Sequence, residues 1–150
     1  MQIYNVCLFG HRQINDLQMI DDRLEAIVGE LIRTKEYVVF YIGRNGAFDE
    51  YAASVIKRVQ REYGKENSEL TLVLPYKVAD IDYYEKYYDS VTIPDVVCGS
   101  YPKSAISRRN RWMIESSSLV IVYEKNDTGG VFDAVRYAKR LDKDITNIAE

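Results

Sequence analysis

Apolar and polar residues follow one another along the chain in blocks that predict strands and helices in turn. Short runs rich in Val, Ile, Leu and aromatic residues are typical of strands buried in a sheet. Tyr37–Ile42 is apolar almost throughout, as expected for a strand that is covered on both faces. The expected strands are Ile3–Phe9, Tyr37–Ile42, Leu70–Leu74, Leu119–Tyr123 and Ile145–Ile148.

Between these runs, apolar residues recur at intervals of three and four, the spacing of one helical face. The first such stretch ends near Thr34, and Asn15 or Asp16 can cap its start. Lys103–Ser117 is expected to form another helix. The helical-face positions are Leu17, Ile20, Leu24, Ile27 and Leu31, then Tyr51, Ala52, Val55, Ile56 and Val59, then Ile106, Asn110, Met113 and Ser117, and last Val131, Val135 and Ala138.

The section Tyr76–Pro94 has the least regular pattern. If Ile81–Asp89 forms a short helix, four of its tyrosines share one side, and we expect them to pack on the body of the protein with their hydroxyls in water. A base-stacking platform is the alternative. Val91–Ile93 or Val96–Val97 is expected to form a minor strand, and the clustered tyrosines are Tyr83, Tyr84, Tyr87 and Tyr88.

The order of these elements predicts an α/β fold, a Rossmann-like three-layer sandwich with a mainly parallel sheet and right-handed crossovers. Ile3–Phe9, Tyr37–Ile42 and Leu119–Tyr123 should lie among its central strands. We expect residues 1–150 to form a single nucleotide-binding domain, since this length suffices for one substantial core.

The composition of the chain argues against several classes of function. A net charge of −3 does not favour non-specific binding to nucleic acid or to anionic membranes. No apolar run has membrane-spanning length, and the first residues do not read as a signal peptide, so a cytoplasmic location is expected. With two cysteines outside any CxxC pair and one histidine, no structural metal site is expected, and no cofactor is predicted.

Three loops at the carboxyl ends of expected strands carry unusual residues. They are Gly10-His11-Arg12, Gly43–Gly46 with Asp49 just beyond, and Asp127–Gly130. Carboxyl ends of parallel strands meet at one edge, where open α/β sheets bind ligands, and the start of the helix after Gly129-Gly130 suits a phosphate. The expected ligand-binding residues are Gly10, His11, Arg12, Gly43, Gly46, Asp49, Arg109, Asn110, Thr128, Gly129 and Gly130. Each has a plainer alternative: the glycines as turn residues, the arginines as solvated or locally paired charges.

Three stretches resemble the SLOG superfamily, and within it the YpsA-like bacterial proteins: VCLFGHR, IGRNGAFDEYAA and SYPKSAISRRNRWMIESSSLVIVYEKNDTGGVFDAVRYAK. The resemblance implies a Rossmann-like fold and a nucleotide or ADP-ribose-type ligand. LOG phosphoribohydrolases of this superfamily use an arginine four residues before a methionine, and Arg109 stands in that place before Met113. Their PGGxGTxxE motif corresponds here to TGGVFDAV, without its proline, third glycine, threonine and glutamate.

These observations leave three functions open. The first is a sensor-like domain for a small nucleotide-like ligand. The second is an enzyme that cleaves an N-glycosidic bond, for which Asp49, Asp133 and Glu115 are the candidate carboxylates. The third is single-strand DNA binding like that of DprA, ranked last because of the net acidity. Membranes and nucleic acid are not expected as partners, and homo-oligomerisation is left open.

Overall fold

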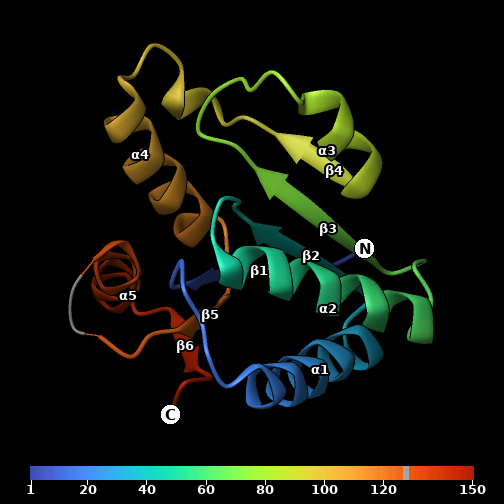
Figure 1. The fold of residues 1–150 in the computed structure, drawn as a ribbon. Helices are drawn as coiled ribbons and strands as arrows, with labels where there is room; N and C mark the ends of the chain where they lie inside the picture. Colours follow the sequence, from blue (N-terminus) through green and yellow to red (C-terminus); the bar gives the residue numbers. More distant parts are fainter. Residues whose placement is uncertain (127–128) are drawn as a thin grey trace.

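Six parallel strands form the sheet at the centre of the molecule, in the order β4-β3-β2-β1-β5-β6 (Figure 1). The computed structural model describes residues 1–126 and 129–150. β2, β1 and β5 are interior strands, as the sequence predicts. The strands are β1 (Ile3–Gly10), β2 (Tyr37–Ile42), β3 (Ser68–Val73), β4 (Ser90–Thr92), β5 (Leu119–Tyr123) and β6 (Asp144–Asn147).

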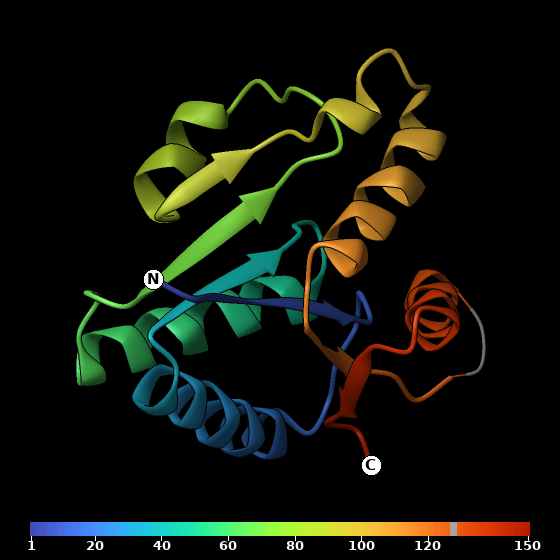
Figure 2. The ribbon, with the colours of Figure 1, turned by 180° about the vertical axis from the view of Figure 1, so that it is seen from behind.

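Helices cover both faces of this sheet, which confirms the Rossmann-like three-layer architecture. α1 and α2 lie on one face, and α4 and α5 lie on the other (Figures 1 and 2). The short α3 sits beside β4. The helices are α1 (Leu17–Thr34), α2 (Ala47–Tyr63), α3 (Ile81–Tyr87), α4 (Pro102–Glu115) and α5 (Gly130–Arg140), with a 3₁₀ turn at Asp95–Val97.

The alternation of side chains along β1 divides its apolar residues between two cores. Val6 and Leu8 pack with α1 and α2, whereas Cys7 and Phe9 pack with α4 and α5. Successive residues of a strand point to opposite faces, so a strand between two helical layers needs apolar residues at every position. This requirement explains the uninterrupted apolar runs in β1, β2 and β5.

The structure differs from the sequence expectations mainly at element ends. Asp16 occupies the N-cap position of α1, as one of the two predicted candidates, but it has a φ of 56° and makes no side-chain capping bond. Its carboxylate instead accepts a 2.6 Å hydrogen bond from Lys125 Nζ. The minor strand is Ser90–Thr92, and Val96–Val97 lies in the 3₁₀ turn. The expected tyrosine helix forms as α3, which buries none of its own residues.

The strand order changes direction at β1. From β1 the chain adds β2, β3 and β4 on one side, and then returns to place β5 and β6 on the other. Ligands of open α/β sheets bind outside the carboxyl ends of the strands at such a switch point, because the flanking loops diverge there. Over the described part of the chain, no helix is long and apolar enough to cross a membrane.

Candidate functional site

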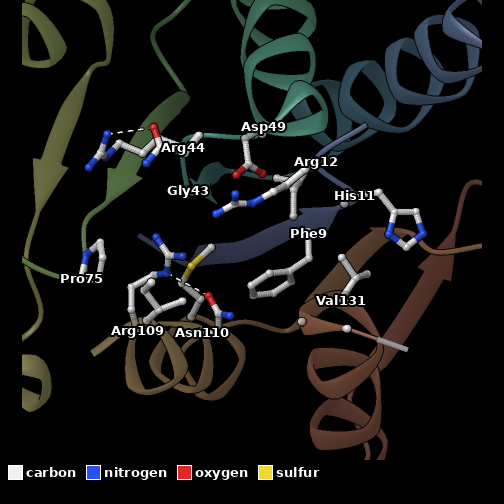
Figure 3. Close-up of a pocket in the computed structure, with 18 of the residues that line it drawn as sticks. Phe9, His11, Arg12, Gly43, Arg44, Asp49, Pro75, Arg109, Asn110 and Val131 are labelled. Atoms are coloured by element: carbon white, nitrogen blue, oxygen red, sulfur yellow. Dashed lines mark hydrogen bonds between the residues drawn. The ribbon is translucent and has the colours of Figure 1, made fainter. Parts of the chain in front are cut away.

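A cavity of about 300 Å³ lies at the switch point, outside the carboxyl ends of β1, β2 and β3 (Figure 3). The loops after these strands form part of its wall, and α4 and the start of α5 complete it. The sequence-predicted residues that line it are Gly10, His11, Arg12, Gly43, Gly46, Asp49, Arg109, Asn110, Gly129 and Gly130. Thr128 and Asp127 fall outside the described residues.

Arg109 projects from α4 into this cavity, where its hydrogen bonds go to neutral groups and the Asp49 carboxyl group acts on its charge from beyond 4.0 Å. Its Nη1 donates a 2.9 Å hydrogen bond to the Val73 carbonyl, and its Nε donates a 2.8 Å bond to Asn110 Oδ1. No carboxylate of the described residues lies within 4.0 Å of its guanidinium. Burial lowers the pKa of Arg109, yet an arginine stays charged in a protein. A partly buried cation that is held by neutral partners is well suited to an anionic ligand.

Asp49 stands on the opposite wall, in the first turn of α2. A Cβ built on Gly43 would lie 3.3 Å from Asp49 Oδ2 and 3.1 Å from Arg109 Nη1. Both side chains therefore converge above Gly43, where any larger residue would crowd them. Burial raises the pKa of Asp49 to about 7, against an opposing effect of Arg109. The cavity consequently contains a carboxyl group that changes charge near neutral pH.

Hydrogen bonds hold the loop after β1 against the start of α2 on one side and against the loop after β5 on the other. The carbonyls of His11 and Arg12 accept hydrogen bonds from the Phe48 and Ala47 amides, so they occupy the first amides of α2. His11 Nε2 accepts a 2.9 Å bond from the Lys125 amide, and the ring points away from the space between Asp49 and Arg109 (Figure 3). His11 therefore ties together the loops after β1 and β5. The exposed Arg12 side chain points into the cavity.

The start of α5 is the second helix terminus at this cavity. The first amides of a helix have no partner within it and carry positive partial charge. Gly129 has φ 94° and ψ −172°, a backbone conformation that is essentially restricted to glycine. No atom of the described residues lies within 4 Å of a Cβ built on Gly129 or Gly130. A ligand can thus approach this backbone closely.

Several lining residues were missed by the sequence analysis, among them Arg44 and Tyr76. Arg44 lies two residues after the end of β2 and Tyr76 three residues after the end of β3, so the reasoning that selected Gly43 and Gly10 would also have found them. Arg44 donates to Asn45 and lies 5.7 Å from the centre of the Tyr84 ring. With Arg12 and Arg109, it gives the described part of the cavity wall three cationic side chains against one carboxyl group. The site is locally positive although the chain is acidic.

The other candidate carboxylates lie elsewhere. Glu115 accepts a hydrogen bond from the Tyr137 hydroxyl, and Asp133 is an exposed residue of the first turn of α5. Among the described residues, Asp49 is the only acidic side chain that lines the cavity. No group of three potential metal-ligating side chains occurs in residues 1–126 and 129–150.

No protein-family model matches the sequence, and no curated protein matches it. Solved structures that share its fold include two DNA processing proteins. DNA processing protein A (DprA) from Streptococcus pneumoniae aligns with a TM-score of 0.69 and 17% identity, over 95% of this chain and 49% of that one. DprA from Helicobacter pylori aligns with a TM-score of 0.63 and 16% identity, over 95% of this chain and 63% of that one. The chain thus spans about half to three-fifths of these proteins, and likeness at this identity shows the fold alone.

The two DprA structures correct the expectation about nucleic acid. Nucleic acid was not expected as a partner, because the chain as a whole is acidic. The Helicobacter pylori protein is described by its single-stranded DNA binding mode, and its fold is the fold found here. Net charge was the wrong quantity to use, since a ligand is bound by the charges that line its site, and those of the described lining residues are mainly positive.

Proposed function

We propose that this chain is a nucleotide-binding domain of the SLOG type, with the ligand phosphate held between Arg109 and the start of α5. The observation that carries the proposal is the Arg109 guanidinium, which lines the cavity and has no ion pair within 4.0 Å among the described residues. The YpsA-like sequence motifs and the DprA-like fold support the assignment to the superfamily.

In this proposal each wall of the cavity has its own role. The α5 amides and Arg109 bind the phosphate, because both offer donors to an anion. A cavity of about 300 Å³ is at the small end of ligand pockets, which favours one nucleotide unit at a time. The signal would be passed on through the loops after β1 and β5, which His11 joins.

Calorimetric titration with AMP, ADP-ribose and a short oligo-dT tests this proposal. At least one of them should bind the wild type saturably, and the Arg109→Ala variant should bind it at least tenfold more weakly. Arg108→Ala is the matched control, since Arg108 is the exposed neighbour that contacts Val96 and Ser100. Equal affinity in both variants would remove Arg109 from the site.

Single-stranded DNA is the second candidate ligand, and the fold shared with a single-strand-binding protein is the observation that favours it. In this case the cavity would hold one nucleotide of a strand, and the strand would continue over the exposed surface. Fluorescence anisotropy with labelled oligo-dT, competed by AMP, separates the two candidates. Tight oligo-dT binding that AMP does not displace would favour the DNA-binding function.

A further inference from the structure

Asp49 is the one acidic group of the described cavity wall, and it faces the cationic groups that would hold a phosphate. Figure 3 shows its carboxyl group, Arg12 and Arg109 pointing toward the same space. Asp49 Oδ2 and Arg109 Nη1 both lie close to a Cβ position built on Gly43, at 3.3 and 3.1 Å. An anion bound by Arg109 would therefore lie beside the Asp49 carboxyl group.

Two other aspartates of this protein are kept ionised by partners. Asp89 accepts hydrogen bonds from the Leu70 amide and Gln60, and Lys65 lies 3.3 Å away, which together lower its pKa. Asp21 is paired with Arg58 at 2.6 Å, and its pKa is also lowered. Within the described residues, the Asp49 carboxyl group has neither a hydrogen bond nor an ion pair. Its pKa is thus set by burial, which raises it, against the nearby Arg109 charge, which lowers it, and no direct partner fixes its protonation state.

The groups around Asp49 come from several elements. Glu50 is its acidic neighbour on α2, and Arg109 faces it from α4. The pKa of Tyr88 is raised by burial first, then by the neighbouring Tyr87 and then by Asp49. The other titratable or charged residues of the cavity wall are His11, Arg12, Arg44 and Tyr76.

We propose that Asp49 takes up a proton from solvent when an anion binds beside Arg109, so that its carboxyl group donates a hydrogen bond to the anion instead of repelling it. This inference rests on the proposed anion site. An ionised carboxylate within a few ångströms of a phosphate would oppose binding, whereas a neutral carboxylic acid adds an O–H donor. The site then binds anionic ligands more tightly as the pH falls.

The electrostatics of the ligand-free protein agree with this geometry. Burial already raises the pKa of Asp49 to about 7, so protonating it near neutral pH requires little free energy. A negative charge added to the cavity raises that pKa further, because like charges disfavour the ionised form. Anion binding and proton uptake therefore favour each other.

Carbon-13 NMR of the aspartate carboxyl groups, with sulfate as the probe, measures this coupling directly. Sulfate is suitable because it keeps the same charge across the pH range used. We expect the Asp49 titration midpoint to move up by about one pH unit in saturating sulfate. The exposed Asp133 serves as the internal control and should move far less.

Three outcomes are distinguishable. Saturable sulfate binding, followed at the Gly130 amide, with the Asp49 midpoint raised supports the proposal. Saturable binding with this midpoint unchanged or lowered overturns the proposal and leaves the anion site in place. A Gly130 amide that does not respond to sulfate overturns the anion site and the proposal with it.

A variant gives an independent readout. Asp49→Asn cannot ionise, so it should bind sulfate about fivefold more tightly than the wild type at about pH 8 and about tenfold more tightly at about pH 9, the equivalent of one pKa unit. The difference should disappear toward about pH 6, where the wild-type carboxyl group is mostly protonated. Glu50→Gln, its exposed neighbour, should keep the wild-type pH profile. An Asp49→Asn variant with wild-type affinity at all these pH values would contradict the proposal.

Discussion

Arg109 is the residue on which the proposed site depends. The sequence analysis left two roles open for it, a local ion pair or a ligand contact. The structure gives it neutral partners, the Val73 carbonyl and Asn110, and no ion pair in the described part of the chain. Its positive charge is thus available to a ligand, while its hydrogen bonds hold the guanidinium in place.

Replacing Arg109 by Ala should separate binding from stability. Ligand binding should weaken by about 1.5–3 kcal/mol, the range for a hydrogen bond to a charged group. The free energy of unfolding should fall by only about 1 kcal/mol, because the Val73 carbonyl loses one donor. Calorimetry and urea unfolding of the same variant measure both quantities. A large loss of stability with unchanged affinity would assign Arg109 to the fold.

Asp49 should make stability depend on pH in a recognisable direction. Its pKa in the folded protein, about 7, lies above the ordinary aspartate value, so the folded state holds an extra proton between the two values. The protonated Asp49 carboxyl group therefore makes its full contribution to the free energy of unfolding below about pH 4. This contribution is lost as the pH rises through about 7 and the group ionises.

The Asp49→Asn substitution removes this dependence. At about pH 8 it should stabilise the ligand-free protein by about 4 kcal/mol, the equivalent of about three pKa units, and the gain should shrink as the pH falls toward about 4. Urea unfolding across this pH range tests the expectation, with Glu50→Gln as the control. A variant that is less stable than the wild type at about pH 8 would show that the ionised carboxylate contributes favourably to the fold.

At the scale of elements, the start of α5 is the part of the site most open to manipulation. A Cβ on Gly130 meets no described atom within 4 Å, so Gly130→Ala and Gly130→Asp should both fold. The aspartate places a negative charge where the phosphate is expected and should weaken binding at least tenfold, or about 1.4 kcal/mol. The alanine variant is the control for the added side chain. Equal affinity in both variants, measured by calorimetry, would exclude this helix start.

The packing of β1 against α2 forms the cavity wall that lies across from the start of α5. A Cβ on Gly10 would lie 2.1 Å from Phe48 Cγ, and Phe48 is fully buried. Gly10→Ala should therefore destabilise the protein by about 2 kcal/mol or more, because the packed ring has no room to move. Urea unfolding should show this loss and a far smaller one for Gly130→Ala. Similar stability in the two variants would refute the packing argument.

The sequence predicted an element well where its own residues determine its place, and poorly where contacts with distant residues do. β1, β2 and β5 were predicted because burial on both faces demands continuous apolar residues. β4 was placed one residue late, because this three-residue edge strand depends on pairing with β3. The left-handed Asp16 could not be foreseen either, since its carboxylate is directed by Lys125, a residue distant in sequence.

For the candidate site, too, the sequence predicted which loops meet, but not how their side chains are oriented. The rule that residues after parallel strands meet at one edge brought together Gly10, Gly43 and Gly129 correctly. It could not give the direction of a side chain, and His11 lines the cavity while its Nε2 bonds to Lys125. The absence of an ion pair between Arg109 and Asp49 also depends on three-dimensional placement.

At the scale of the whole molecule, an acidic chain with a positive cavity should bind oligo-dT and AMP with different dependences on salt concentration. Single-strand binding becomes weaker with salt in proportion to the phosphates neutralised, with a slope of about −0.7 for each. With Arg12, Arg44 and Arg109 all engaged, oligo-dT should give a slope of about −2, and AMP a much shallower one. Anisotropy titrations at several salt concentrations measure this. A steep slope that persists in Arg109→Ala would place the strand outside the cavity.

The central claim is that the cavity at the β1 switch point binds a nucleotide phosphate. The most direct measurement is an amide NMR titration of the wild type and Arg109→Ala with AMP. We predict saturable shifts that are largest at Gly43, Gly129 and Gly130 in the wild type and strongly reduced in the variant. Shifts that are absent, or that concentrate away from these residues and persist unchanged in Arg109→Ala, would contradict the account.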